Sequence, residues 1–514
     1  MKPKTVLKTE TLVAVFILLG LHLNSCKPEN ENKNKPSNLH QSWYKKSAKQ
    51  GDAKAQYKLG LALYNAKGVK QNCKDAFDWF KKSAEQGNAK AQYNLGLMYF
   101  KGEGVERNYV EASNWFKKAA EQGDADAQHY LGTAYRNGYG VEQNYKEASN
   151  WFKKSAEQGN AKAQYNLGLM YYNGAGVERN YEKGMSWFKK AAEQGDVEAQ
   201  NNLGLIYLKG AGVERNYTQA ANWYEKAAKQ GNIMAQGSLS NMYYVGLGVK
   251  QNYKEAMSWY EKAAKQGDAQ AQYNLGLMYY SGKGVERNYK EAMNWYKKSA
   301  EQGVVQAQHD LWAMYDKGEG VERDYKEAMN WYKKSAEQGN VIAQYYLGLM
   351  YYSGKGVERN YKEAMNWYKK SAEQGVVQAQ HDLWAMYDKG EGVERDYKEA
   401  MNWYKKSAEQ GNVIAQYYLG LMYYSAKGVK QNFKEAFNWY KKSAEQGDAQ
   451  AQYSLGLMYD KGEGVKQDYK EAVDWYKKAA LQGHSDARTV LVKTLVNSSK
   501  NVKTSKKQKD DKNG

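Results

Sequence analysis

The sequence has 514 residues, of which 76 are Lys or Arg and 57 are Asp or Glu, so its formal net charge is +19. It contains two cysteines, too few for a disulfide framework. A basic surplus of this size can indicate nucleic acid or an anionic surface as partner. Here Lys-Lys pairs spread the charge along the chain and no nucleic-acid recognition motif accompanies it. We therefore interpret it as a solvated face and expect no specific nucleic-acid partner.

The first 40 residues differ from the rest and predict export. Residues 1–25 have a basic start followed by the apolar run Thr11–Leu23, which is typical of a signal peptide and short for a membrane span. The run ends in Leu23-Asn24-Ser25-Cys26, which resembles a bacterial lipobox and marks Cys26 as the lipidation site. An ordinary cleaved signal or an uncleaved anchor is the alternative. Residues 26–40 are polar and predict a flexible tether.

A tryptophan recurs every 36 residues through most of the chain. This comb consists of Trp43, Trp79, Trp115, Trp151, Trp187, Trp223, Trp259, Trp295, Trp331, Trp367, Trp403, Trp439 and Trp475. A fixed period of this length predicts a stacked array of supersecondary units, each contacting mainly its neighbours. We expect the comb tryptophans to be buried and structural. Cys73 takes a position that later units fill with tyrosine, so we expect a buried small apolar residue there.

Each unit predicts two helices joined by glycine-containing turns. In the unit that begins at Ala89, the first helix is expected over Ala89–Lys101 and ends at Gly102, since glycine tolerates a left-handed C-terminus. The second opens at Asn108, with Glu111 at capping-box spacing, and runs to about Glu121.

The recurring residues resemble the Sel-one-like repeat, a relative of the tetratricopeptide repeat. They are Ala-x-Ala, Leu-Gly-x-Met-Tyr, Gly-x-Gly-Val, an alanine three residues before the tryptophan, and Ala-Ala-x-x-Gly. The resemblance covers twelve full units from Ala53 to His484 and a leading half-unit over Gln41–Asp52. It implies an all-α solenoid forming a right-handed superhelix over residues 41–497, followed by a disordered basic tail at 498–514. It also implies a role as an adaptor scaffold for proteins.

The first helix of each unit has a predicted buried stripe. Counting Ala89 as position one, this stripe comprises Ala91, Leu95, Met98 and Tyr99, and Gly96 beside it permits a close helix approach. Trp312 and Trp384 replace this glycine in two units, where we expect wider packing. The two units belong to a 72-residue block that occurs twice without change, at 281–352 and 353–424.

Positions two, five, nine and twelve lie roughly opposite the stripe, and aromatic residues are frequent at five and twelve. The candidate partner-binding residues are Tyr57, Tyr64, Tyr93, Phe100, Tyr165, Tyr172, Tyr273, Tyr280, Tyr345, Tyr352, Tyr417 and Tyr424. They would line the concave groove of a tetratricopeptide-type stack, where tyrosine is a favourable contact residue. Alternatively, the rings pack between neighbouring first helices.

No catalytic or metal-binding constellation is evident. His309 and Asp310, and their copies His381 and Asp382, are adjacent on a helix, and we expect them to face different ways. No metal-ligand spacing and no phosphate-binding loop is present, so we expect no cofactor, metal or small-molecule substrate. We predict a non-catalytic scaffold, lipid-anchored in a bacterial cell envelope, with a protein or peptide partner. The alternative is an exported enzyme, or the regulatory subunit of an envelope enzyme, built on the same repeats.

Overall fold

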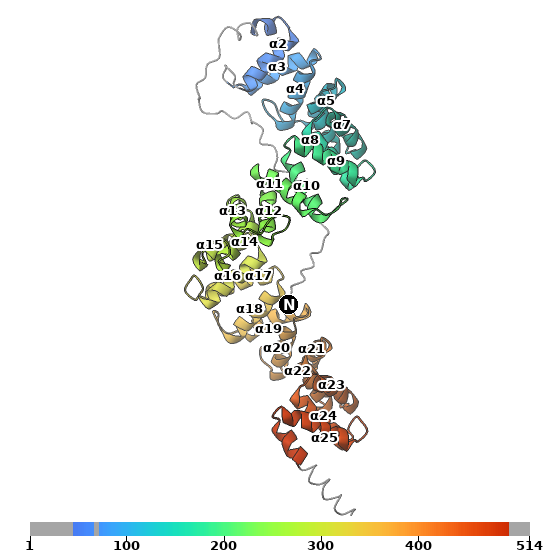
Figure 1. Cartoon of the computed structure of the whole chain (residues 1–514), viewed down its shortest axis with the longest axis vertical. Helices are drawn as coiled ribbons and strands as arrows, with labels where there is room; N and C mark the ends of the chain where they lie inside the picture. Colours follow the sequence, from blue (N-terminus) through green and yellow to red (C-terminus); the bar gives the residue numbers. More distant parts are fainter. Residues whose placement is uncertain (1–44, 66–70, 493–514) are drawn as a thin grey trace, which may run out of the picture. The chain divides into compact units, whose positions relative to one another are not determined.

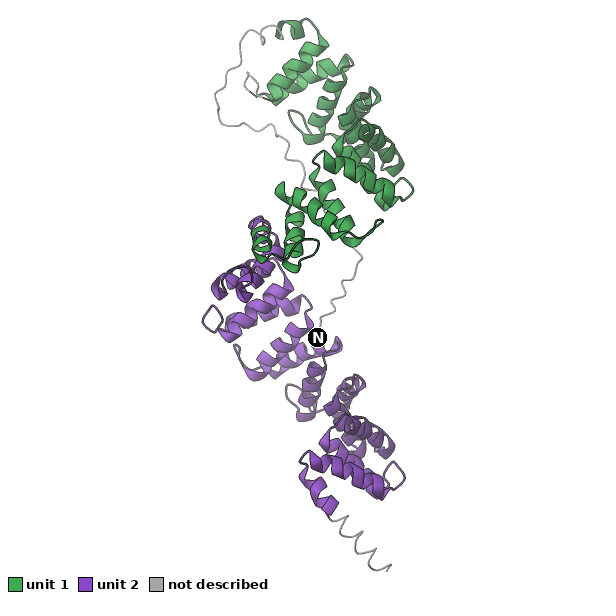
Figure 2. Ribbon diagram, in the orientation of Figure 1, with its two compact units in different colours: residues 1–259 green, residues 260–514 purple. Residues whose placement is uncertain are grey.

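The computed structural model describes residues 45–65 and 71–492, and within these residues it contains helices and no strand. The chain divides into two compact units, one up to Trp259 and one from Tyr260 (Figure 2). Consecutive helices form antiparallel pairs that stack on one another within each unit (Figure 1). The predicted all-α architecture of stacked helix hairpins is confirmed. The right-handed superhelical path of the whole array stays a prediction.

The first helices of the repeats carry even labels. They are α2 (Ala53–Tyr64), α4 (Ala89–Lys101), α6 (Ala125–Asn137), α8 (Ala161–Asn173), α10 (Val197–Lys209), α12 (Ile233–Val245), α14 (Ala269–Ser281), α16 (Val305–Lys317), α18 (Val341–Ser353), α20 (Val377–Lys389), α22 (Val413–Ser425) and α24 (Ala449–Lys461).

The second helices carry odd labels. They are α3 (Cys73–Glu85), α5 (Tyr109–Glu121), α7 (Tyr145–Glu157), α9 (Tyr181–Glu193), α11 (Tyr217–Lys229), α13 (Tyr253–Lys265), α15 (Tyr289–Glu301), α17 (Tyr325–Glu337), α19 (Tyr361–Glu373), α21 (Tyr397–Glu409), α23 (Phe433–Glu445) and α25 (Tyr469–Leu481). Helical residues 45–49 precede α2, and residues 485–492 follow α25.

Local sequence sets the ends of these helices as predicted. Gly102, at the end of α4, has a positive φ of 77°, a conformation that L side chains rarely adopt. The Asn108 side chain accepts hydrogen bonds from the backbone N–H groups of Val110 and Glu111 at 3.0 and 3.1 Å, so it caps α5. The reciprocal half of the capping box is absent here, because the backbone N–H of Asn108 donates instead to the carbonyl of Tyr99 at 2.9 Å.

Each helix pair encloses a small core that the glycine of the first helix makes possible. Ala91, Leu95 and Met98 are fully buried, as predicted, whereas Tyr99 is only partly buried. A Cβ atom on Gly96 would lie 2.7 Å from the ring of Phe116, so glycine is required for this approach. In α16–α17 and α20–α21, tryptophan replaces this glycine and the two helices pack less closely, which confirms the expected widening.

The residue after each comb tryptophan is the buried aromatic centre of the repeat. Tyr296 is 1% exposed, whereas Trp295 is half-buried. The comb tryptophans of α11 and α17 are buried, but those of α3, α5, α7 and α9 are only partly so. The prediction that every comb tryptophan is buried is therefore wrong for part of the array. The indole lies at the junction between repeats instead, as Trp367 does against the core formed by α15–α18.

Hydrogen bonds of a buried glutamine tie each repeat to the one before it. The Gln92 side chain donates from Nε2 to the carbonyl of Ala84 at 3.1 Å and accepts at Oε1 from Gln122 at 2.7 Å. The same pair of bonds recurs farther along, for example from Gln344 to Ala336 and from Gln374 to Gln344. These bonds satisfy an amide that is buried at each junction, and so favour one register between repeats.

Two predictions concern the beginning of the chain. Cys26, the predicted lipidation site, and residues 1–40 lie outside the described residues. Cys73, at the start of α3, is half-buried against the core of α3 and α4, which corrects the expectation of a buried residue. Within residues 45–65 and 71–492, no helix is long and apolar enough to cross a membrane.

Candidate partner-binding surface

The position-five tyrosines are half-buried and bridge neighbouring repeats. Tyr273 of α14 donates a hydrogen bond from its hydroxyl to Asp310 Oδ2 of α16 at 3.1 Å. Tyr165 of α8 accepts one from Asn202 of α10 at 3.3 Å. Burial, followed by the charge of Asp382 and a hydrogen bond to it, raises the pKa of Tyr345 to about 12. Each hydroxyl therefore joins position five of one repeat to position six of the next.

The rings of these tyrosines also contact the core aromatic residue of their own repeat. The centroids of Tyr345 and Tyr368 are 5.7 Å apart, and those of Tyr273 and Tyr296 are also 5.7 Å apart. The remaining predicted position-five residues make the same kind of contact, as the pairs Tyr57–Phe80, Tyr93–Phe116, Tyr165–Phe188 and Tyr417–Tyr440 show. The position-five side chains thus contribute to packing and leave only part of each ring at the surface.

At position twelve, tyrosine hydroxyls bind the loop that follows the first helix of the next repeat. The Glu319 and Glu391 carboxylates each accept a hydrogen bond of 2.9 Å, from Tyr280 and Tyr352 respectively. Tyr64 and Tyr424 bind Glu103 and Glu463 in the same way. Phe100 and Tyr172, which lack this contact, lie against Tyr109 and Tyr181 instead. Position twelve is therefore half-buried and links adjacent repeats.

Position two is exposed in every first helix, and position nine beside it is exposed in α10, α12 and α18 and half-buried in the others. Since they are seven residues apart, these positions point within about 20° of one another. In the second unit, Ile342 at position two is 42% exposed, its copy Ile414 is 49% exposed, and Leu349 at position nine is 37% exposed. The predicted site lay on this side of the first helices, but it comprised only the aromatic residues at positions five and twelve. The aliphatic residues at positions two and nine were the signal that this prediction missed.

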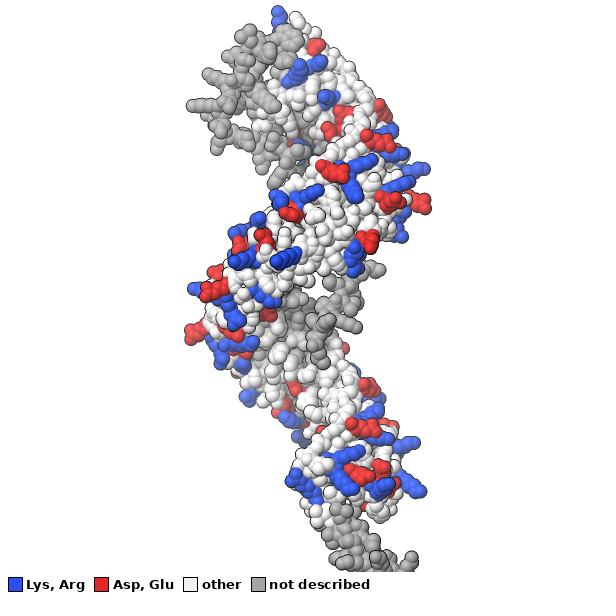
Figure 3. Space-filling view, viewed as in Figure 1, with Lys and Arg blue, Asp and Glu red and all other residues white. Residues whose placement is uncertain are grey.

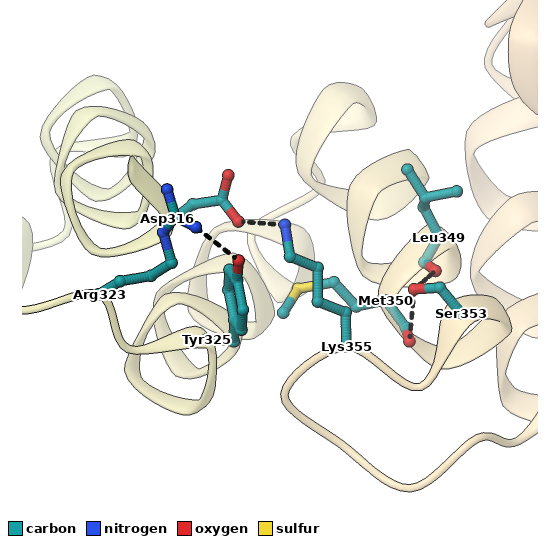
Figure 4. A network of polar contacts seen from close by, with 7 residues as sticks. All are labelled: Asp316, Arg323, Tyr325, Leu349, Met350, Ser353 and Lys355. Carbon is teal, nitrogen blue, oxygen red and sulfur yellow. Dashed lines mark hydrogen bonds and ion pairs between the residues drawn. The ribbon is translucent and has the colours of Figure 1, made fainter. Parts of the chain in front are cut away.

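The duplicated block carries a polar network on both of its copies. Lys355 Nζ lies 2.7 Å from Asp316 Oδ1 and 4.1 Å from the centroid of the Tyr325 ring, and Arg323 donates to the Tyr325 hydroxyl at 3.3 Å (Figure 4). In the same view, Ser353 bonds back to the Leu349 carbonyl within α18. The network joins the loop after α18 to the end of α16 and neutralises the Asp316 carboxylate.

Asp310, a second acid on α16, contacts a histidine instead of a lysine. Asp310 Oδ1 lies 3.0 Å from His309 Nδ1, and the copy Asp382 is likewise 3.0 Å from His381. This contact corrects the expectation that the two adjacent side chains face different ways. It does not complete a nucleophilic triad, because in the described part of the chain no hydrogen bond joins either imidazole to a serine, threonine or cysteine side chain. Trp312, beside His309, stacks on Tyr332 with centroids 4.0 Å apart and also contacts Tyr346.

The second helices present a mixed, charged face. Lys298 Nζ lies 4.1 Å from the centroid of the Trp295 ring, and the lysine three residues after the comb tryptophan does the same in other repeats, for example Lys334 over Trp331. Acidic side chains are interspersed with basic ones on the visible surface (Figure 3). Within the described residues no group of three His, Cys, Asp or Glu side chains could hold a metal ion.

Stacked helix hairpins with polar and aromatic bridges from each repeat to the next define an α-solenoid. The family comparison identifies its type. A Sel1 repeat model matches residues 41–52, 53–88, 89–124, 125–160, 161–196, 197–232, 233–268, 269–304, 305–340, 341–376, 377–412, 413–448 and 449–484. The chain belongs to the Sel1 repeat family, whose members are generally non-catalytic protein-interaction scaffolds.

One solved structure agrees with this assignment over most of the chain. The chain is similar to c5321, a protective antigen of uropathogenic Escherichia coli, at 36% sequence identity with a TM-score of 0.66, covering 89% of this chain and 97% of that one. It is also 33% identical to a Sel1 repeat protein from Oxalobacter formigenes, over 63% of this chain and 92% of that one, with a TM-score of 0.48. No curated protein sequence matches this chain significantly.

Proposed function

We propose that this chain is a non-catalytic scaffold that binds a partner protein or peptide on the open face of its first helices. The observation that carries the proposal is the exposure of Ile342, Leu349 and Ile414 in the second unit. Aliphatic side chains on a solvent-facing helix are candidate contacts for a partner. The half-buried tyrosines at positions five and twelve border them and present ring edges, which suits recognition.

The bordering tyrosines have two roles in this proposal. Tyr345 and Tyr352 hold adjacent repeats in register through Asp382 and Glu391. Their exposed ring edges then extend the aliphatic surface of α18. In this proposal the tyrosines both pack between neighbouring repeats and contact the partner.

Binding can be tested by affinity capture from the native host with matched variants of the full chain. Replacing Ile342 and Leu349 with serine should remove a specific partner, because both side chains are exposed and neither supports the core. Tyr345→Phe and Tyr352→Phe keep the rings and should reduce capture less. The control replaces Lys297 and Lys298 of α15 with glutamine. Loss of the partner in this control, with retention in the α18 variants, would place the binding surface on the second helices and refute the proposal.

We further propose that the protein is exported and held in a bacterial cell envelope by a lipid on Cys26. The support is the order of a basic start, the apolar run Thr11–Leu23 and the sequence Leu23-Asn24-Ser25-Cys26. Cys26→Ala should abolish fatty-acid labelling and release the protein from the membrane fraction. If labelling persists in this variant, the lipid proposal fails.

A further inference from the structure

The first-helix face of the second unit has an unusual charge for this basic protein. At positions two and six of α14 to α24 it carries no lysine or arginine, and its charged residues there are Asp310 and Asp382. The first unit differs, since Lys54, Lys90 and Lys162 occupy position two. Lysine returns in the second unit only at the C-terminal ends of these helices, as Lys317, Lys389 and Lys461. At these positions the face therefore combines acidic, aliphatic and aromatic residues with uncharged polar ones, and it has no lysine or arginine.

Asp316 and Asp310, both on α16, have different partners. Asp316 is paired with Lys355 at 2.7 Å. Asp310 accepts hydrogen bonds from the Tyr273 hydroxyl and the neighbouring imidazole. Across the described helices and loops, neither Asp310 nor its copy Asp382 forms an ion pair with lysine or arginine. Their side chains remain 30% exposed, so the carboxylates are oriented by fixed donors and accessible to a cation from outside.

Each of these carboxylates shares the open face of the first helices with aliphatic side chains of the next first helix, because positions two, six and nine point within about 60° of one another. The ring of Tyr346 on α18 contacts Trp312 on α16 at 5.5 Å, which brings the two first helices together. Asp310 on α16 is thus followed by Ile342 and Leu349 on α18, a combination that we define as station one. The unchanged second copy provides station two, with Asp382 on α20 and Ile414 and Leu421 on α22. Leu421 is half-buried, and the other members are exposed or half-exposed.

We propose that these two stations bind a partner segment that combines lysine or arginine with aliphatic side chains, and that one partner bearing two such segments engages both. This inference rests on the proposed function and specifies the chemistry of its partner. The basic side chain would pair with the oriented carboxylate, and the aliphatic side chains would cover Ile342 and Leu349. An acidic segment is disfavoured, because it would be repelled by a carboxylate that no lysine or arginine neutralises. Because the two stations have the same residues, a partner that binds both gains affinity from effective concentration.

A second copy of this chain is the competing occupant, because its second helices are rich in lysine. Some of those lysines are already engaged within the chain. Lys298, for example, covers the Trp295 ring, and Lys229 is paired with Glu225 at 2.7 Å. A separate partner therefore fits the stations better than another copy.

The test uses a random peptide library displayed on phage and panned against the purified full chain. We expect enrichment of peptides that contain lysine or arginine beside leucine, isoleucine or valine. The dissociation constant of an enriched synthetic peptide is then measured by fluorescence anisotropy. The double variant Asp310→Asn and Asp382→Asn should weaken binding at least tenfold. Asp126→Asn, an exposed acid at position two of α6, is the control and should leave binding unchanged.

Valence is tested with two copies of the enriched peptide joined by a flexible linker. The tandem peptide should bind the wild-type chain at least tenfold more tightly than the single one. Asp382→Asn alone should remove this gain and return binding close to the single-peptide value. An equal gain in wild type and variant would overturn the two-station arrangement.

The outcomes separate this inference from the proposed function. If Ile342→Ser with Ile414→Ser weakens the peptide but the aspartate variants do not, the face binds proteins and the basic chemistry is wrong. Enrichment of acidic peptides also overturns it. The stations are refuted if no peptide is enriched, or if the dissociation constant is the same in wild type and in both sets of variants. In that case the capture experiment with the α18 variants decides whether the scaffold proposal stands. Concentration-dependent self-association in sedimentation velocity that the aspartate variants abolish would identify a second copy as occupant and refute a separate partner.

Discussion

The hydroxyl of Ser371 donates a hydrogen bond of 2.8 Å to the carbonyl of Val341, and so joins α19 to the first turn of α18. The equivalent hydroxyl of Ser335 is buried and has no partner among the described residues. The difference coincides with the residue that precedes the first helix. Asn340 caps α18 through its side chain, whereas Val304 precedes α16 and provides no side-chain cap. The repeat formed by α16 and α17 therefore lacks two interactions that its neighbour has.

Val304→Asn should stabilise this repeat. A side-chain cap at a helix N-terminus typically adds ~0.5–2 kcal/mol to the free energy of unfolding. We expect an increase in this range by urea denaturation, together with slower amide hydrogen exchange in α16. The matched control, Asn340→Val, removes a cap from α18 and should lower stability by a similar amount. An unchanged or lower stability for Val304→Asn would show that the first turn of α16 cannot accept a capped geometry.

Two glycines give a second pair of matched variants. A methyl group at position 96 would lie 2.7 Å from the Phe116 ring, so Gly96→Ala should lower the free energy of unfolding by ~1–3 kcal/mol through overpacking. Gly237 lies within α12, and nothing would lie within 4 Å of an added methyl group there. Gly237→Ala should raise stability by up to ~1 kcal/mol, because alanine is the better helix former. Chemical denaturation measures both, and equal effects would contradict the predicted close approach at Gly96.

The aromatic pair in α15 should show which ring carries the stability of the repeat. Tyr296 is 1% exposed, so Tyr296→Ala should cost ~3–5 kcal/mol. Trp295→Ala should cost less, since this indole is half-buried and covered by Lys298. Lys298→Ala serves as the control for the cation–π contact and should cost about 0.5–1 kcal/mol. A larger loss for Trp295→Ala than for Tyr296→Ala, measured by denaturant unfolding, would reverse this ranking.

The helix boundaries were predictable because short-range chemistry fixes them. The glycine after α4 and the asparagine before α5 determine where those helices end and begin, whatever the surroundings. The exposure of particular side chains was less predictable. Position five differs from positions two and nine by only about 40–60° around the helix, and this angle separates Tyr345, which packs on Tyr368, from the open Ile342.

Contacts across repeats were the other feature that sequence periodicity could not provide. Every residue recurs at the same spacing, so the period does not tell whether Tyr352 meets its own repeat or the loop that holds Glu391. The missing cap at Val304 was visible as a departure from Asn or Asp, but its coincidence with the unpartnered Ser335 hydroxyl required coordinates. The same applies to His309 and Asp310, whose side chains converge although they are adjacent on a helix.

His129 should make the first unit sensitive to acid. Its ring on α6 lies against Phe152, and its Nε2 is 3.1 Å from the Asn166 amide, which therefore donates to a neutral imidazole. Burial, followed by the positive charges of Lys162 and Arg136, lowers the pKa of His129 to about 3. The ordinary value in an unfolded chain is about 6.5.

The sign of the resulting pH dependence follows from linkage. Between pH 6.5 and pH 3 the unfolded chain binds a proton at this histidine that the folded chain does not, so the contribution to stability is present above about pH 6.5 and is lost as the pH falls. We expect wild type to lose more stability than His129→Gln between pH 7.5 and pH 4.5, since glutamine does not titrate. Carboxylates such as Asp196 occur in both proteins and cancel in this difference. Urea denaturation at the two pH values measures it, and parallel losses in both proteins would show that His129 accepts a proton in the folded state.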